Sequence, residues 1–321
     1  MRVMSAGDGY KYLLRTVATG DGERTLSTPL TRYYAEGGTP PGRWIGSAVT
    51  ALGGGALAVG DEVTEQQLQL LIGQGFDPVT KKALGRPYRK YPTTAERIQR
   101  RTAKLDTKLP VTERAAAVAA IESEEAARDS RKAVAGFDFT FSIPKSASVL
   151  WAVSDAGTQS LIADAHHAAV AEMVAFIERE VAATRVGSAG RNGAVSQAEV
   201  SGVIATAFDH YDSRAGDPHL HTHVVISNKV QTVHDGRWRS LDGRTLHAAT
   251  VALSELHEAV FADHLTRAFG VEWEARSMGR DRNPAWAVTG VPEELVAEFS
   301  TRARHIDTET DRLIAQYVTK H

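Results

Sequence analysis

The sequence predicts an α+β fold, in which helices pack against a central antiparallel sheet. Segments in which apolar and polar residues alternate, as in half-buried strands, occur at 136–142, 200–210 and 219–228. Longer segments with apolar residues at helical spacing occur at 159–183 and 246–269. Together these patterns favour an antiparallel sheet with helices on it.

The N-terminal part contains fewer regular elements. Residues 61–72 are expected to form a short helix with Leu68, Leu71 and Ile72 on its inner side. Residues 111–132 are rich in alanine and glutamate, and this composition predicts another helix.

The segment at 136–142 predicts a strand whose two faces differ. Three phenylalanines share one face: Phe137, Phe139 and Phe141. The opposite face is polar and carries Asp138, Thr140 and Ser142. The strand therefore presents a carboxylate on the face away from the phenylalanines.

Turn and cap signals delimit the later elements. Asp217-Pro218 marks a turn between the second and third strands, and Asp235-Gly236 marks the turn of a hairpin. The second long helix is expected to stop at Gly270. A strand at 285–288 precedes a helix that Pro292 opens.

Composition excludes several classes of protein. The 321 residues include no cysteine, so disulfides and cysteine-ligated zinc sites are excluded. No uninterrupted apolar run has the length of a membrane span, and the N-terminus lacks the apolar core of a signal peptide. We therefore expect a cytoplasmic protein without membrane insertion. The net charge of −2 shows that the chain as a whole is not a basic nucleic-acid binder.

One segment is nevertheless strongly basic. Residues 81–108 contain ten lysines or arginines against two acids, Glu96 and Asp106. The ten cations are Lys81, Lys82, Arg86, Arg89, Lys90, Arg97, Arg100, Arg101, Lys104 and Lys108. Tyr88 and Tyr91 lie among them and could stack on bases, which makes the segment a candidate for DNA contacts. A solvated basic face would show the same pattern.

A cluster of histidines indicates a metal site. His219, His221 and His223 share one face of a predicted strand, and His210 ends the preceding strand. If the two strands pair, His210 comes beside His221 and His223, and three neutral imidazoles on one rigid face suit a divalent metal. Asp138 could orient one imidazole or accept a proton from a hydroxyl nucleophile.

Other histidines are expected to be structural residues: His166, His167, His247, His257 and His264. The bland alternative for the cluster itself is a set of polar surface or core residues.

Two blocks of the sequence resemble signatures of MobF-class conjugative relaxases, which belong to the HUH endonuclease superfamily. Residues 137–148 (FDFTFSIPKSAS) are similar to the D-x-T-F-S-x-P-K-S-x-S block of that family, and residues 217–223 (DPHLHTH) to its D-P-x-L-H-T-H block. Shorter elements agree with it: Ser213-Arg214, Tyr33-Tyr34 followed by GRWIG at 42–46, and FSTR at 299–302.

The resemblance implies a palm-like sheet with additional helices over a DNA cleft. It implies a divalent metal at His210, His221 and His223, with Mg²⁺ or Mn²⁺ first and Zn²⁺ or Ni²⁺ as alternatives. Asp138 would assist the nucleophile or orient a histidine, whereas His219 is not counted as a ligand.

The implied activity is nicking of one DNA strand at an origin of transfer, with a 5′-phosphotyrosyl intermediate, a free 3′-hydroxyl and later rejoining. The implied partners are single-stranded or hairpin origin DNA, a type IV secretion coupling protein and accessory DNA-binding proteins. Lys145 and Arg214 fall within the family motifs and are expected to contact DNA.

The family's nucleophile is an N-terminal tyrosine, and this chain offers several. Tyr12 is preferred, because the Tyr-Leu-Leu that begins there aligns best with the family's first helix, and Tyr10 is second. Tyr33 and Tyr34 would serve a second transfer step or bind DNA.

The chain departs from the family in the long distance between its N-terminus and Asp138. The surplus lies mostly in residues 60–132, which we interpret as a helical basic insertion that grips DNA through Arg97, Arg100 and Arg101. The expected organisation is a relaxase domain at 1–290 and a helical segment at 291–321 that leads to a helicase region absent from this sequence.

Three alternatives stay open from the residues. A rolling-circle replication initiator uses related chemistry but usually has its tyrosine after the histidines. A metal-dependent hydrolase would use the same histidines to activate water, and a DNA-binding module would use none of them for catalysis.

Overall fold

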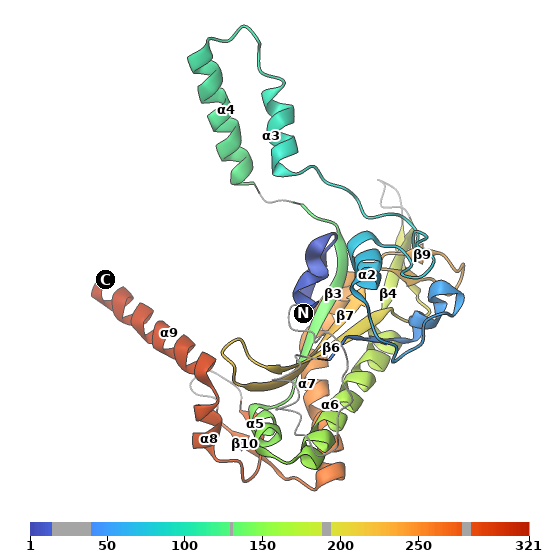
Figure 1. Ribbon diagram of the computed structural model, residues 1–321, viewed down its shortest axis with the longest axis vertical. Helices are drawn as coiled ribbons and strands as arrows, with labels where there is room; N and C mark the ends of the chain where they lie inside the picture. Colours follow the sequence, from blue (N-terminus) through green and yellow to red (C-terminus); the bar gives the residue numbers. More distant parts are fainter. Residues whose placement is uncertain (15–39, 129–130, 188–193, 278–283, 321) are drawn as a thin grey trace.

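The centre of the protein is a five-stranded antiparallel sheet with the order β1-β3-β7-β6-β2 (Figure 1). Its strands are β1 (Arg2–Ser5), β2 (Arg43–Ile45), β3 (Val134–Ser142), β6 (Ala205–Asp212) and β7 (Pro218–Ser227). The computed structural model describes residues 1–14, 40–128, 131–187, 194–277 and 284–320. The predicted α+β class with an antiparallel sheet is confirmed.

The strand predicted from residue 200 begins later, at Ala205. Gly202 has a φ of +95°, a left-handed conformation that interrupts an extended chain. The Gly202 site also has no room for a side chain, because a Cβ atom there would lie 2.0 Å from Ser47 Oγ.

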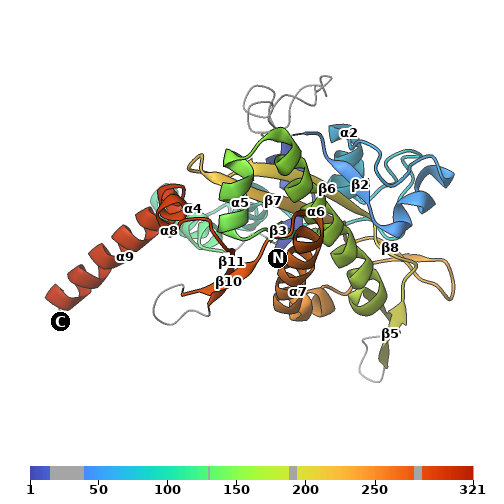
Figure 2. The ribbon, with the colours of Figure 1, turned by 90° about the horizontal axis from the view of Figure 1, so that it is seen from below.

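Two long helices cover one face of the sheet. They are α6 (Ala156–Phe176), which continues as the π-turn η4 (Ile177–Val181), and α7 (Gly243–Phe269). The two helices lie side by side in Figure 2 and contact each other along their length. Their apolar residues pack on the phenylalanine face of β3, and the predicted packing of the two long helices against the sheet is confirmed. The helix α7 starts before the expected residue 246, because the Asp242 side chain caps it by accepting from the Arg244 amide.

The helix α6 together with η4 is long and apolar enough to cross a membrane by length and composition alone. Half of its most apolar 18-residue stretch is buried inside the fold, where Ile162, Ala169 and Met173 are almost fully covered. These contacts identify it as a core helix of this domain.

Short helices cover the other face of the sheet. They are η1 (Asp8–Leu14), η2 (Ser47–Gly54), α2 (Glu65–Leu68) and η3 (Gln69–Gln74). Leu68, Leu71 and Ile72 are buried there as predicted, and they pack with Trp44 and Phe208 in one core cluster. A capping box at Thr64 and Gln67 starts α2.

Two further helices form an arm that projects away from the sheet (Figure 1). They are α3 (Thr94–Thr102) and α4 (Val111–Ala126), and we call residues 94–126 the helical arm. The buried carboxylate of Glu125 joins them by accepting from Arg97 Nε at 2.6 Å and Arg101 Nη1 at 3.0 Å. The helix predicted at 111–132 is shorter than expected and ends at Ala126.

The remaining elements lie beside the sheet or at the opposite end from the arm. Two small hairpins pair β4 (Ala183–Gly187) with β5 (Val195–Glu199) and β8 (Val230–Gln231) with β9 (Trp238–Arg239). At the end away from the arm lie α5 (Lys145–Val153), β10 (Trp273–Arg276), β11 (Ala285–Val288), α8 (Glu293–Glu298) and α9 (Thr301–Lys320). The predicted hairpin turn at Gly236 is present, and its φ of +64° is a conformation that glycine adopts without strain.

The contact between Gly42 and Phe208 gives a test of this packing. A Cβ atom at Gly42 would lie 2.2 Å from the Phe208 ring, which is buried in the core. We expect Gly42→Ala to lower the free energy of unfolding by about 1–3 kcal/mol in urea denaturation. Gly9→Ala is the control, because its new Cβ atom would meet nothing closer than 3.7 Å. Equal stabilities of the two variants would contradict the packing.

Candidate metal centre and nucleophile

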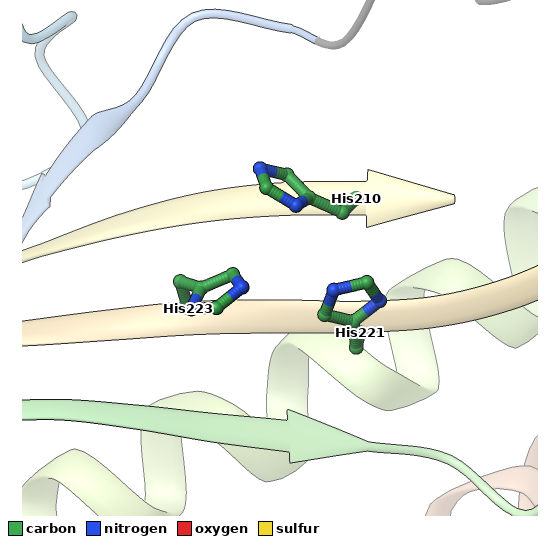
Figure 3. Close-up of side chains that lie close together, drawn as sticks. All are labelled: His210, His221 and His223. Atoms are coloured by element: carbon green, nitrogen blue, oxygen red, sulfur yellow. The ribbon is translucent and has the colours of Figure 1, made fainter. Parts of the chain in front are cut away.

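Three histidines converge on one face of the sheet (Figure 3). His210 comes from β6, and His221 and His223 come from β7. Antiparallel pairing places His210 directly opposite His221, with His223 one strand period away. One ligand nitrogen from each lies within 4.8 Å of the others, which is compact enough for a single metal ion. The structure thus brings together the three residues predicted as ligands.

The hydrogen bonds of two imidazoles direct their Nε2 lone pairs to the centre of the cluster. His221 Nδ1 lies 2.7 Å from the backbone carbonyl oxygen of His219, so it carries the proton and donates. His223 Nδ1 lies 2.9 Å from Asp138 Oδ1 and donates to that carboxylate. In both rings Nε2 is then left to bind a metal.

His210 supplies a separate indication that a metal fits. Its Nε2 is buried and has no hydrogen-bond partner among the described residues. An unpaired buried polar atom is costly unless a ligand completes it. Burial, followed by the neighbouring imidazoles, lowers the pKa of His210 to about 4. Burial also lowers the pKa of His221, and this outweighs the hydrogen bond to the His219 carbonyl. Both rings are therefore neutral at pH 7, as metal binding requires.

Tyr12 and Asp138 form the second half of the site. Tyr12 lies in η1, and its hydroxyl donates to Asp138 Oδ2. The same carboxylate accepts from His223 Nδ1, so one acid joins the tyrosine to the histidine cluster. The Tyr12 and His223 rings are 6.1 Å apart in an edge-on arrangement. Burial, and then the charge of Asp138, raises the pKa of Tyr12, so the phenol keeps its proton at neutral pH.

The other candidate tyrosines differ in their surroundings. Tyr10 is only 2% exposed and belongs to the core cluster formed by η1 and η3, so its contacts are those of a packing residue. Tyr33 and Tyr34 lie outside the residues that the structure describes. Among the described tyrosines, Tyr12 is therefore the one whose hydroxyl meets the histidine cluster through a carboxylate.

The residues predicted to bind DNA are distributed over the molecule. Arg214 is exposed in the turn between β6 and β7, two residues beyond the end of β6. Lys145 is half-buried and donates to the carbonyl oxygen of Pro218 at 2.6 Å. Arg100 is exposed on the helical arm, whereas Arg97 and Arg101 form ion pairs with Glu125 inside it. These last two arginines therefore have a structural task that the sequence did not reveal.

Two further residues near the site were given no role in the sequence analysis. The Arg2 guanidinium lies 4.7 Å from the centre of the Tyr12 ring and favours the ionised phenol. Arg302, in α9, lies close enough to His219 that its charge contributes to lowering the pKa of that histidine to about 4, after burial, His221 and Lys145. The block at 299–302 gave a signal for Arg302, but no pattern indicated Arg2.

Comparison with known proteins identifies a family and related folds. A family model described as TrwC relaxase matches residues 6–321. The multifunctional conjugation protein TraI of Escherichia coli is 33% identical over 180 residues, which cover 53% of this chain and 9% of TraI. The chain thus spans a small part of the length of that relative.

Solved structures share the fold. A copper-bound complex of the conjugative relaxase TrwC with oriT DNA matches with a TM-score of 0.63 and 24% identity, covering 96% of this chain and 81% of that one. A TrwC complex with a 27-mer DNA that comprises the recognition hairpin and the cleavage site matches with a TM-score of 0.60 and 21% identity, covering 97% and 81%.

The burial of His210 predicts a proton-linked loss of stability. Its pKa is about 4 in the folded protein and about 6.5 in an unfolded chain. The unfolded state therefore binds a proton that the folded state excludes between these values, and the free energy of unfolding falls as the pH falls through this window. In metal-free protein, His210→Gln should make this pH dependence shallower by up to about one proton.

The measurement is urea denaturation at several pH values between 7 and 4, with EDTA present. His234→Gln is the control, because that imidazole is 56% exposed. An unchanged slope in His210→Gln would show that His210 is not shielded from protons as described.

Proposed function

Because the chain belongs to the TrwC relaxase family, we propose that it nicks one strand of DNA at an origin of transfer and later rejoins it. The observation that carries the proposal is the Asp138 carboxylate, which accepts hydrogen bonds from both Tyr12 and a histidine of the triad. A tyrosine, a base and a metal-ready cluster are thus in direct contact.

Tyr12 is the proposed nucleophile. Its Oη forms a bond to phosphorus while the bond from phosphorus to the 3′ oxygen breaks, and the phenolic proton passes to Asp138 Oδ2. The departing 3′ oxygen takes a proton from solvent, so the products are a 5′-phosphotyrosyl adduct and a free 3′-hydroxyl. One phosphodiester replaces another, and the step is therefore nearly isoenergetic and can run backwards to rejoin the strand.

The raised pKa of Tyr12 suits this sequence of events. A neutral phenol is not repelled by the anionic phosphate, and it loses its proton to Asp138 only as the new bond forms. A divalent cation held by His210, His221 and His223 would supply positive charge that offsets the negative charge of the phosphate. Mg²⁺ or Mn²⁺ is our first choice, and Zn²⁺ or Ni²⁺ are the alternatives.

DNA contacts are proposed at both ends of the site and along the basic segment. Arg214 is exposed beyond the triad and can contact a phosphate, with Lys145, Tyr33 and Tyr34 as further candidates.

In the basic segment we assign the main role to the exposed cations that precede the arm: Arg86, Arg89 and Lys90. Arg100 joins them, whereas the charges of Arg97 and Arg101 are already compensated by acids.

The organisation proposed for the chain is a relaxase domain with residues 60–132 as an insertion. Val291 is buried, and Leu295 and Phe299 pack with α5, so we move the end of the domain from residue 290 to about residue 300. The segment that follows would lead toward a helicase region. Origin DNA in the cytoplasm, a secretion coupling protein and accessory DNA-binding proteins are the proposed partners.

The nucleophile assignment predicts how two conservative variants differ in forming a covalent adduct with DNA. With labelled single-stranded origin DNA and Mn²⁺, the protein should form a covalent adduct that survives a denaturing gel. Tyr12→Phe should lower adduct formation by at least about a thousandfold, because the attacking oxygen is gone. Tyr10→Phe should retain it, and EDTA should abolish it. Cleavage without an adduct would indicate a hydrolase that activates water instead.

The DNA-contact assignment predicts a change in salt dependence. Each phosphate contact to a single strand contributes about 0.7 to the slope of log K against log salt. The double variant Arg89→Ala/Lys90→Ala should therefore reduce that slope by roughly 1.4 in fluorescence anisotropy titrations. Arg179→Ala/Arg267→Ala removes two exposed charges elsewhere and is the control. Equal slopes for both variants would remove the basic segment from the DNA-binding surface.

A further inference from the structure

A chain of four polar side chains lies on the face of β6 and β7 opposite to the histidine triad. Each member is at most 3% exposed: Asp209, Thr222, His166 and His257. The first two belong to β6 and β7, whereas the two histidines come from α6 and α7. Because they are buried beneath the sheet, none of them can touch DNA.

The hydrogen bonds of this chain run in one direction. Thr222 Oγ1 donates to Asp209 Oδ1 at 2.5 Å, because an ionised carboxylate can only accept. The same Thr222 oxygen accepts from His166 Nε2 at 2.8 Å. His166 Nδ1 then carries a lone pair and accepts from His257 Nε2 at 3.2 Å. Burial lowers the pKa of His166, so the neutral ring that this arrangement requires is the stable form.

The acceptor end of the chain is fixed by charge. Arg43 Nη1 lies 2.5 Å and His167 Nε2 lies 3.0 Å from Asp209 Oδ2. Burial alone would raise the pKa of Asp209, but His167 and Arg43 keep it well below its usual range. Asp209 is therefore a permanent acceptor, and β2, which carries Arg43, is joined to the same point.

The Asp209–Thr222 pair lies directly beneath the triad. In the β6–β7 ladder, Asp209 is opposite Thr222, His210 is opposite His221, and Phe208 is opposite His223. A shift of this ladder by one residue would turn His221 and His223 to the wrong face. The Asp209–Thr222 hydrogen bond exists only in the observed register.

We propose that Asp209, Thr222, His166 and His257 are positioning residues, which fix the register of β6 against β7 and thereby the spacing of the three metal-binding imidazoles. The helices α6 and α7 take part because His166 of α6 donates to Thr222 and His257 of α7 donates to His166. This inference rests on the proposed function in so far as it assumes that the triad binds a metal.

The test is the affinity for Co²⁺, measured by titration calorimetry and by the visible absorption of the bound ion. Thr222→Val keeps the shape of the side chain and removes both of its hydrogen bonds. We expect its Co²⁺ affinity to fall by about tenfold, with an altered absorption spectrum. Thr222→Ser restores the hydroxyl and should recover wild-type affinity and spectrum.

Thr206→Val is the matched control. Thr206 is 1% exposed on β6, and its hydroxyl has no hydrogen-bond partner among the described residues. Its replacement should leave the Co²⁺ affinity unchanged. His257→Leu provides a second variant that leaves the strands untouched and should weaken Co²⁺ binding less than Thr222→Val, because it removes only the far end of the chain.

The outcomes separate this inference from the proposed function. Wild-type affinity and spectrum in a folded Thr222→Val protein would overturn the positioning role and leave the relaxase proposal intact. Failure of the unmodified protein to bind Co²⁺ would overturn both. Weaker binding in Thr222→Val that Thr222→Ser restores, with Thr206→Val unaffected, supports the proposal.

Discussion

The pairing of β6 with β7 is the constraint on which the rest of the site depends. A strand repeats every two residues, so one ladder presents histidines on one face and a buried hydrogen-bonded pair on the other. Three imidazoles can meet within 4.8 Å only while that ladder keeps its register. The backbone hydrogen bonds of five strands keep them rigid, which is why the cluster needs no loop to complete it.

Asp138 extends this rigidity to Tyr12, the proposed nucleophile. It lies on β3, the strand next to β7, and its two oxygens accept from a histidine and from a phenol. A buried carboxylate is stable only with such donors, so the same hydrogen bonds that satisfy it also orient Tyr12 and His223. The helix η1 is thus attached to the sheet through Tyr12 as well as through Leu13 and Tyr10.

The sequence was informative where a local period or a cap determines structure. Alternation on two strands predicted the faces of Asp138 and of the histidines, and Gly270 predicted the end of α7, whose C-cap has a φ of +71°.

The sequence contained no indication of contacts between residues that are far apart along the chain. Glu125 pairs with arginines 24 and 28 positions away, and His257 meets a histidine 91 positions away. No periodicity encodes such contacts, so the sequence did not indicate that Arg97 and Arg101 pair with an acid. The different surroundings of Tyr12 and Tyr10 likewise became visible only in three dimensions.

The attachment of the helical arm has a consequence for how such a domain can change. Tyr88, before the arm, donates to the carbonyl oxygen of Ala135, just after it, at 3.0 Å. Lys229 lies beneath the Tyr88 ring at 4.6 Å and donates to the carbonyl oxygen of Arg86, so the entering segment is fastened to the end of β7. The chain therefore leaves and re-enters the body at neighbouring points, and the helical arm in between projects away from the sheet (Figure 1). Evolution can lengthen, shorten or exchange that excursion as a separate module while the catalytic palm keeps its strand order.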